Sequence, residues 1–456
     1  MATLDSSIVN IALPTLTHDL NSDLYRVKWV VIVYLLVVTC LLLPFGRLSD
    51  QYGRKRVFQT GFFIFTLGSV FCGLSDHLTT LVLARMVQGL GVAMLMANGP
   101  AIITAAFPST ERGTALGTLA MVVSGGLLSG PGIGGILITH LGWRSIFWVN
   151  LPIGILGMIL VQKSLNRDAA CVQREPFDWG GTALQVVLFI SFIVLFDPPN
   201  VSISGSLPFP ISRWLVATFV LIIGAIFLKV ESQVRAPVFD LSLLKNRTFC
   251  AANLASFFLF VAFSSVSVLM PFFLEIVLHF STKKAGLFMT AIPLTVFVVA
   301  PISGRLSDRV GSSELSIAGT LVGALGLFAM AGLFGAGMDA AVTPGGIVLG
   351  LASIGLATGL FQSPNNNSIM GSVPPNKLGV ASAFLATVRN LGLVTGTGLA
   401  TSLFTWRMME TGNFVSSIHF THCFAGGVGL LAMIASLGKR RERGYGLETE
   451  RESTHS

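Results

Sequence analysis

Two charged residues lie inside long apolar stretches of this sequence, where an ionisable group can take up and release protons. Asp5 is the one carboxylate well within such a stretch, and Arg85 is the one basic residue well within the apolar stretches of the first half. A charge at the centre of a membrane helix costs about 2.5–3.5 kcal/mol on insertion scales, so each residue needs a partner or a wet cavity. An acid whose pKa is raised by desolvation can load a proton on one side and release it on the other. We therefore predict that Asp5 carries protons; the alternative is a structural Asp5 bonded to neighbouring backbone.

A short polar turn occurs twice, as GRLSDQYGRKRV at residues 46–57 and as GRLSDRVGSS at residues 304–313. Each copy separates two long apolar stretches, which indicates a duplicated bundle of membrane helices. The glycines are expected to allow a tight chain reversal, and the aspartates to accept hydrogen bonds from a neighbouring helix N-terminus or an arginine. Such a contact can latch two halves together and be broken again, although the basic residues equally serve as topology determinants. The second copy lacks the basic triplet, so a weaker role is expected there. The predicted gate consists of Gly46, Asp50, Gly53, Arg54, Arg56 and Asp308.

A ridge of small residues runs through the apolar stretch near residues 114–139. Its glycines recur every four residues, which places them on one face of a helix and permits close helix approach. A proline among them removes a backbone donor and disturbs the bond to the carbonyl of Leu127, so a kink is expected. We predict that this helix packs tightly against the other half and seals the cytoplasmic side when the cavity faces outward; the alternative is simple small-residue packing. The ridge consists of Gly126, Gly130, Pro131, Gly134 and Gly135.

Amides inside apolar stretches are weaker candidates for lining a substrate cavity. Gln88 shares a helical face with Arg85, and Gln362 and Asn365 lie together in a later stretch. No pattern of metal ligands, of nucleophile and base, or of an ATP-binding loop stands out in the sequence. We therefore predict neither an enzyme nor a bound metal or cofactor, and we expect the proton gradient to supply the energy.

Membrane helices must position these residues. Hydrophobic residues make up 52% of the 456 positions and charged residues 11%, against about 25% charged residues in soluble domains. Runs of about 20 apolar residues predict an all-α membrane protein with fourteen spans. The predicted parts are an N-terminal six-helix bundle at 1–163, a linker with two inserted helices at 164–247, a C-terminal six-helix bundle at 248–438 and a basic tail at 439–456.

Basic residues are distributed unevenly between the two sides of the predicted membrane. Twenty Lys and Arg residues lie on the side of the GRLSD turns and the tail, and seven lie on the other side. Because cytoplasmic loops are enriched in Lys and Arg, both turns and both termini are predicted to be cytoplasmic. The formal net charge of +8 is therefore an orientation signal, and we do not expect nucleic-acid binding.

Four further segments carry a resemblance to a known family. They read LDSSIVNIALP from Leu4, LVLARMVQGLGVA from Leu81, GLLSGPGIGGIL from Gly126 and WRSIFWVNLPIG from Trp143. With the GRLSD turns, they resemble the major facilitator superfamily, in which two six-helix halves pack together. The turns lie eight predicted helices apart instead of six, so two spans, near 179–197 and 214–230, are inserted between the halves. That count resembles the fourteen-span drug–proton antiporter branch, the EmrB/QacA subfamily.

The resemblance implies what the individual residues do. It places Arg85 in the proton-transfer machinery with Asp5 as its partner, against the alternative of an Arg85 held by helix-end carbonyls. It also identifies the glycine ridge as the antiporter signature. Family members have more apolar residues before the first acid. We therefore expect the true start to lie upstream of Met1, because a span starting there is too short to bury Asp5 deeply.

The sequence thus predicts a proton-coupled antiporter that exports lipophilic small molecules, cationic ones included, by alternating access. Because carboxylates are scarce in the spans, dications are expected to be exported weakly. The alternatives are an uptake or facilitated-diffusion carrier for a metabolite and a non-transporting receptor. The expected partners are the small-molecule substrate, protons and the lipid of the cell inner (plasma) membrane, and the protein is expected to be a monomer.

Overall fold

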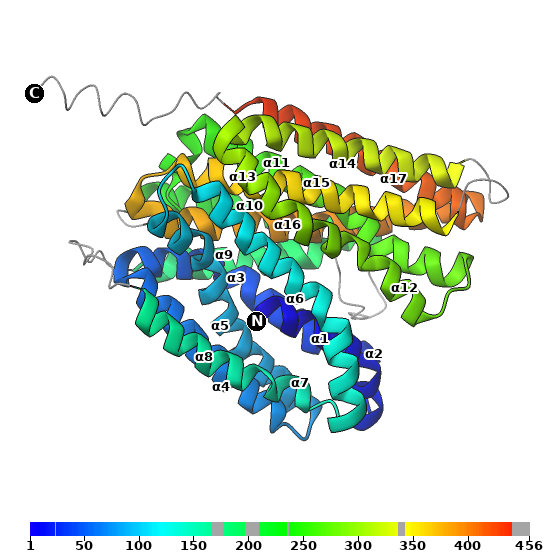
Figure 1. Ribbon diagram of the computed structural model, residues 1–456, viewed down its shortest axis with the longest axis horizontal. Coiled ribbons are helices and arrows are strands. Elements are labelled where there is room, and N and C mark those ends of the chain that lie inside the picture. Colours follow the sequence, from blue (N-terminus) through cyan, green and yellow to red (C-terminus); the bar gives the residue numbers. More distant parts are fainter. Residues whose placement is uncertain (23, 166–176, 197–208, 235–236, 336–342, 440–456) are drawn as a thin grey trace, which may run out of the picture.

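Helices form all the regular secondary structure in the described part of the chain, and they build two bundles side by side (Figure 1). A membrane helix satisfies its backbone hydrogen bonds internally, which is why the long apolar stretches fold in this way. The predicted all-α class is confirmed. The computed structural model describes residues 1–22, 24–165, 177–196, 209–234, 237–335 and 343–439.

The first bundle runs from α1 to α8. α1 packs against α6, α4 packs against α5 and α8, and α3 packs against α5. The sixth predicted span is divided between the short α7 and the longer α8. The bounds are α1 Ala2–Asp19, α2 Leu24–Val27, α3 Trp29–Tyr52, α4 Arg54–Gly73, α5 Leu78–Ala106, α6 Arg112–Leu141, α7 Ser145–Trp148 and α8 Asn150–Ser164.

The second bundle repeats this arrangement from α11 to α17. α14 packs against α15 and α17, and α11 packs against α16. The two bundles meet where α13 packs against α6 and where α16 packs against α3. The bounds are α11 Arg247–Phe272, η2 Phe273–Val277, α12 Thr282–Met289, α13 Ala291–Val310, α14 Ser312–Gly335, α15 Pro344–Gly371, η3 Pro375–Lys377, α16 Leu378–Thr411 and α17 Phe414–Leu437.

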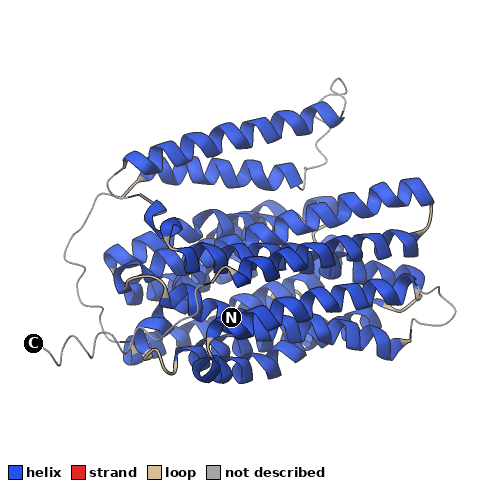
Figure 2. Cartoon of the chain, turned by 90° about the horizontal axis from the view of Figure 1, so that it is seen from above, coloured by secondary structure: helices blue, strands red, loops and turns tan. Residues whose placement is uncertain are grey.

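The two inserted helices, α9 (Trp179–Phe196) and α10 (Phe209–Gln233), form a hairpin at the edge of the bundles, where it stands apart in Figure 2. α9 touches both α3 and α16, so the hairpin lies beside the junction of the two halves. Gln185 of α9 is buried and donates a hydrogen bond to the carbonyl of Cys40 at 3.1 Å. The short η1 helix (Leu241–Lys245) leads from the hairpin into the second bundle.

Twelve of the described helices or helix pairs are long and apolar enough to cross a membrane. α1 and α9 are absent from that set: α1 carries Asp5, His18 and Asp19, and α9 is shorter. The fourteen-span count therefore stays a prediction, as do the domain boundaries. The predicted tail beyond Lys439 lies outside the described residues.

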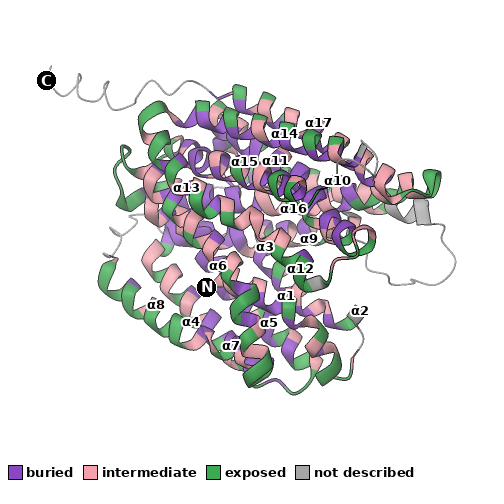
Figure 3. Cartoon of the chain, turned by 45° about the vertical axis from the view of Figure 1, so that its right-hand side comes forward, coloured by how far each residue is buried: buried purple, intermediate pink, exposed green. Residues whose placement is uncertain are grey.

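Buried residues line the insides of the bundles, and exposed residues lie on their outer faces (Figure 3). Many of the exposed residues are large and apolar. One buried cluster joins the halves near the GRLSD turns, and we call it the apolar seal. It brings α5 of the first bundle together with α15 and α16 of the second. The apolar seal includes Ala97, Ala101, Ile369, Met370, Leu385 and Ala386.

Candidate functional site

Asp5 and Arg85 form a fully buried ion pair. Asp5 Oδ2 lies 2.6 Å from Arg85 Nη1, and neither side chain is accessible to solvent. α1 and α5 supply the two charges, although they are 80 positions apart in the sequence. The two opposite charges neutralise each other, which is the condition under which charges can be buried in an apolar bundle.

Amides complete the shell around the Asp5 carboxylate. Asp5 Oδ1 accepts hydrogen bonds from Gln88 Nε2 at 3.0 Å and from Asn150 Nδ2 at 2.8 Å. Gln88 Nε2 also donates to Ser69 Oγ at 2.8 Å, and Gln88 Oε1 accepts from Arg85 Nη1 at 2.5 Å. Gln88 is fully buried in this cluster, so it does not line an open cavity as predicted. The reason is its position one turn after Arg85, on the face that meets Asp5.

Arg85 has supports besides the carboxylate. Its Nε donates to the carbonyl of Val30 at 3.1 Å, and its guanidinium lies 4.1 Å from the centre of the Tyr34 ring. Arg85 Nη2 and Asn150 Oδ1 are buried without a hydrogen-bond partner. Unsatisfied buried polar atoms are costly, so each of them calls for an explanation, and a functional role is one. We call Asp5, Ser69, Arg85, Gln88 and Asn150 the Asp5 cluster.

Asp5 is only 1% exposed, although four residues precede it. The prediction that a span starting at Met1 is too short to bury Asp5 deeply is therefore wrong. Thr3, two residues before Asp5, lies against Gly126, which is near the middle of α6. Asp5 is buried by its partners on α5 and α8 and by the contact of α1 with α6.

The opposite face of α1 rests on the glycine ridge of α6. A side chain added at Gly126 would meet Thr3, and one added at Gly130 would meet Ser7. Residues 3 and 7 each lie two positions from Asp5, which is about half a turn of helix. α1 is therefore held between the Asp5 cluster on one face and bare α6 backbone on the other.

Pro131 explains one contact across this interface. A proline has no amide hydrogen, so the carbonyl of Leu127, four residues earlier, lacks its helical donor. Ser7 Oγ donates to that carbonyl at 3.1 Å. α6 continues as one helix from Arg112 to Leu141. The expected disturbance at Leu127 is thus repaired by α1.

The ridge does not face the other half, contrary to the prediction. The contact with α13 is made by Gly113 and Gly117, where an added side chain would meet Gly304 and Ala300 backbone. Gly126 lies nine residues after Gly117, which is two and a half turns and therefore the opposite face of the helix. Gly135 has no atom near its missing side chain. A four-residue spacing identified a smooth face but not the helix that covers it.

The first GRLSD turn caps a helix of the other half. Asp50 accepts hydrogen bonds from the backbone amides of Gly379 at 2.8 Å and Val380 at 2.9 Å, at the start of α16. Arg54 Nη2 lies 3.1 Å from Asp50 Oδ1 and also donates to the carbonyl of Pro375. A carboxylate at a helix N-terminus is stabilised by the exposed amides and by the helix dipole. Arg56 is exposed at the surface.

The second turn makes the equivalent contact in the opposite direction. Asp308 accepts from the backbone amides of Gly113 at 2.7 Å and Thr114 at 2.8 Å, and from the Thr114 hydroxyl at 2.6 Å. These residues begin α6 of the first half. Asp308 caps its helix with an added hydroxyl in place of an arginine, and a weaker role of this copy in gating stays a prediction. We call these contacts the Asp50 latch and the Asp308 latch.

The glycines of the two GRLSD turns have different structural roles. Gly53 and Gly311 end α3 and α13 with φ of +99° and +111°, a backbone conformation that favours glycine. Gly46, which was expected to reverse the chain, lies inside α3, where an added side chain would collide with Ala383 and the carbonyl of Gly379. Gly46 therefore permits close approach of the halves.

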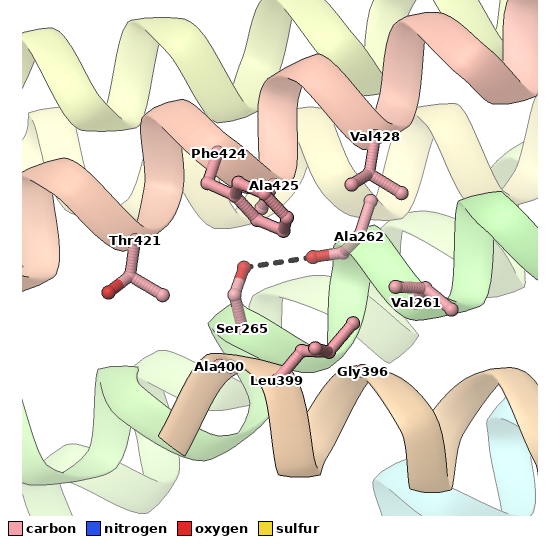
Figure 4. A pocket seen from close by; sticks show the side chains of 10 residues that line it. All are labelled: Val261, Ala262, Ser265, Gly396, Leu399, Ala400, Thr421, Phe424, Ala425 and Val428. Atoms are coloured by element: carbon pink, nitrogen blue, oxygen red, sulfur yellow. Dashed lines mark hydrogen bonds between the residues drawn. The ribbon is translucent and has the colours of Figure 1, made fainter. Parts of the chain in front are cut away.

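The other predicted cavity residues lie elsewhere. Asn365 is buried near the end of α15 and accepts a hydrogen bond from Lys439 Nζ at 2.8 Å, and Gln362 is half-buried one turn earlier. Neither joins the Asp5 cluster. A small apolar pocket between α11, α16 and α17 is lined by residues such as Val261, Leu399 and Phe424 (Figure 4).

The sequence did not single out Ser69 or Asn150. Asn150 lies in the segment WRSIFWVNLPIG, where it is the polar residue of the apolar part, and this was the available signal. Ser69 has no comparable signal, because serines are common in membrane helices and bond to their own backbone. No group of three or more potential metal ligands occurs among the described residues.

Comparisons with known proteins agree with this architecture. The family described as Major Facilitator Superfamily matches residues 1–397. The riboflavin transporter RibZ of Clostridioides difficile is 38% identical over 416 residues, which cover 91% of this chain and 88% of that protein. The multidrug resistance protein Stp of Mycobacterium tuberculosis is 30% identical over 403 residues, covering 87% of this chain and 72% of that protein. The solved proton:xylose symporter XylE shares the fold, with a TM-score of 0.67 at 16% identity over 96% of this chain and 94% of that chain.

Proposed function

The chain belongs to the major facilitator superfamily, and we propose that it is a proton-coupled antiporter that exports lipophilic small molecules by alternating access. Family membership makes it a multi-pass membrane transporter of small molecules and not an enzyme. The proposal goes further, to proton coupling, direction and substrate class. The observation that carries it is the buried ion pair between Arg85 of α5 and Asp5 of α1, the helix that also supports α6.

A proton on Asp5 would change the balance of charge in the cluster. The ionised carboxylate attracts Arg85 at 2.6 Å and accepts from two amides. Once protonated, Asp5 loses its charge and its attraction for Arg85, while the guanidinium keeps Val30, Gln88 and the Tyr34 ring as supports. Protonation therefore removes the ionic contact between α1 and α5 and leaves Arg85 on these remaining supports. Protonation is in this way converted into a movement of one helix.

α6 is the element that can carry such a movement to the gate. Its middle touches α1 through Gly126 and Gly130, and its first residues are held by Asp308. A shift of α1 would alter the support of α6 and strain the Asp308 latch at the other end of the same helix. One rigid helix thus joins the proton site to the junction of the halves.

The latches correspond to one state of the transport cycle. Both are formed, and the apolar seal closes the space between the halves at the same end. With the turns on the cytoplasmic side, this is the state closed to the cytoplasm. Breaking both latches would open the other state. The binding of protons and of substrate would then decide which state is populated.

The lipophilic substrate class is supported by relatives named as multidrug resistance proteins and multidrug transporters. A preference for cations has less support than the sequence suggested. Asp5 is the one carboxylate that the sequence places well within a span, and Arg85 neutralises its charge. The second candidate is a carrier for an aromatic metabolite, favoured by the 38% identity to a riboflavin transporter over 91% of the chain.

The test is substrate-driven proton movement in everted membrane vesicles. A susceptibility panel in an export-deficient host first identifies an exported compound. Adding that compound to energised vesicles should collapse part of the pH gradient with the native protein and leave it unchanged with Asp5→Asn. Asp19→Asn, an exposed acid at the end of the same helix, is the matched control and should behave as the native protein. Compound movement without any pH change would instead indicate a facilitated-diffusion carrier.

A further inference from the structure

Arg389 is a cation inside α16 that the proposed function leaves without a role. It lies eleven residues after Leu378, the first residue of the helix, which is about 16 Å along the axis. Its guanidinium lies 5.9 Å from the centre of the Phe260 ring. None of the ion pairs between described residues involves Arg389. Ionisable residues at membrane depth are costly, so an uncompensated one indicates a functional site.

Arg389 is a charge deep within the spans without a neighbouring opposite charge among the described residues. Asp5 and Arg85 cancel each other at 2.6 Å. The remaining positive charge sets the sign of the field in the interior, and low-dielectric walls strengthen it. An interior of this sign favours an anion over a cation of the same size and shape.

The side chain of Arg389 is turned away from the periphery of the bundle. Phe384 marks the peripheral face of α16, because its ring stacks on Phe239 and Phe249, near the α9–α10 hairpin. Leu393 lies nine residues later, which is half a turn away, and Arg389 shares the Leu393 side of the helix. On a third face, Asn390 bonds Thr39 of the first half at 3.2 Å. Arg389 therefore faces the region between the two halves.

Accessibility along this face changes at Arg389. Leu385 and Ala386, one turn nearer the GRLSD turns, are 5% and 7% exposed and belong to the apolar seal. Arg389 is half-buried, and Leu393 is 36% exposed. On this face of α16, the residues of the apolar seal are thus followed by a half-buried guanidinium and then by an exposed leucine.

We propose that Arg389 binds the anionic group, a carboxylate, phosphate or sulfonate, of an amphiphilic substrate. A guanidinium offers paired N–H donors that match the oxygens of such groups. The Phe260 ring beside it offers an apolar surface to the rest of the molecule. The cargo role rests on the proposed function; the anion site does not, because binding requires no proton gradient.

The test uses a cysteine at Leu393 as a local reporter of charge. Leu393→Cys, in a background without the five native cysteines, is treated with an anionic methanethiosulfonate (ethylsulfonate) and a cationic one (ethyltrimethylammonium). Each rate is divided by the rate of the same reagent with free glutathione. The normalised rate should favour the anionic reagent by about tenfold, as expected for a focused positive field.

The reporter is read again in two matched variants. Arg389→Gln should bring the ratio to about one, and Arg389→Lys should keep most of it, because the charge is retained. A ratio at or below one with Arg389 present, a ratio that Arg389→Gln leaves unchanged, or an unreactive cysteine at 393 would each overturn the proposal. Asp5→Asn should abolish substrate-driven proton movement, and Arg389→Gln should lower the ratio in that background as well, so the two proposals fail independently.

Protection of the reporter distinguishes binding from a general electrostatic effect. Benzoate and phenyl phosphate should slow the reaction of Leu393→Cys, and benzylammonium of similar size should not. Stronger protection by benzoate identifies a carboxylate site, and stronger protection by phenyl phosphate identifies a phosphate site. Equal protection by all three compounds, or by none, would overturn Arg389 as a binding residue.

Discussion

Asp308 Oδ1 accepts a hydrogen bond from the backbone amide of Gly113 at 2.7 Å, across the junction between the two halves. Asp50 makes the same contact with Gly379 at 2.8 Å, with the halves exchanged. Each GRLSD turn thus holds the first turn of a helix in the opposite bundle. The duplication in the sequence has become two reciprocal contacts at one end of the molecule.

Because the contacts are equivalent, Asp50→Asn and Asp308→Asn should loosen the junction to a similar extent. Each replacement removes a charge from a helix N-terminus, an interaction of roughly 0.3–2 kcal/mol. A cysteine at Ala101, within the apolar seal, should then react with N-ethylmaleimide several-fold faster in both variants. Asp19→Asn is the control. Acceleration by Asp50→Asn alone would show that the second turn is not a latch.

The glycine ridge should be sensitive to substitution in proportion to its contact with α1. Gly130→Ala would press a methyl group against Ser7, whereas Gly135→Ala meets open space. Overpacking of this kind costs roughly 1–3 kcal/mol. Gly130→Ala should therefore lower the melting temperature of the purified protein and impair transport, and Gly135→Ala should do neither. A larger loss with Gly135→Ala than with Gly130→Ala would show that α1 does not pack on Gly130.

The Asp5–Arg85 pair should behave as a unit in a double-mutant cycle. Arg85→Gln leaves Asp5 without its partner, and breaking a buried pair costs roughly 3–5 kcal/mol. The double variant Asp5→Asn, Arg85→Gln contains no charge and should recover most of that loss in melting temperature. Proton movement should remain abolished in the double variant. Strictly additive losses would mean that the two side chains do not interact.

The Asp240 carboxylate should stabilise the folded protein at neutral pH but not at strongly acidic pH. Burial raises the pKa of this carboxyl, but hydrogen bonds from Lys377 and Ser242 outweigh burial and hold the pKa below its usual 3.8. A group with a lowered pKa stabilises the fold above its unfolded pKa, and the contribution disappears as the pH falls through the folded value. Asp240→Asn should therefore lower the melting temperature at pH 7, and the difference from the native protein should shrink as the pH falls below 3.8. A difference that grows as the pH falls would contradict this pairing.

Much of the architecture follows from the sequence because membrane helices are specified locally. Apolar runs of sufficient length mark the helices, and the repeated GRLSD marks the duplication. The two charged residues within such runs, Asp5 and Arg85, can be recognised in the sequence for the same reason. A charge in an apolar stretch indicates that a partner is needed, even when the sequence does not identify that partner.

The tertiary structure decided which faces meet. Asn150 joins Asp5 over 145 positions, and the glycine ridge supports α1 instead of the opposite half. Asn365, a predicted cavity residue, meets Lys439 near the end of α15. Periodicity gives the angle of a residue around its own helix, but in lipid every face of a helix can be apolar or small. The choice of neighbour is therefore set by the packing of all the helices together, which no single stretch of sequence contains.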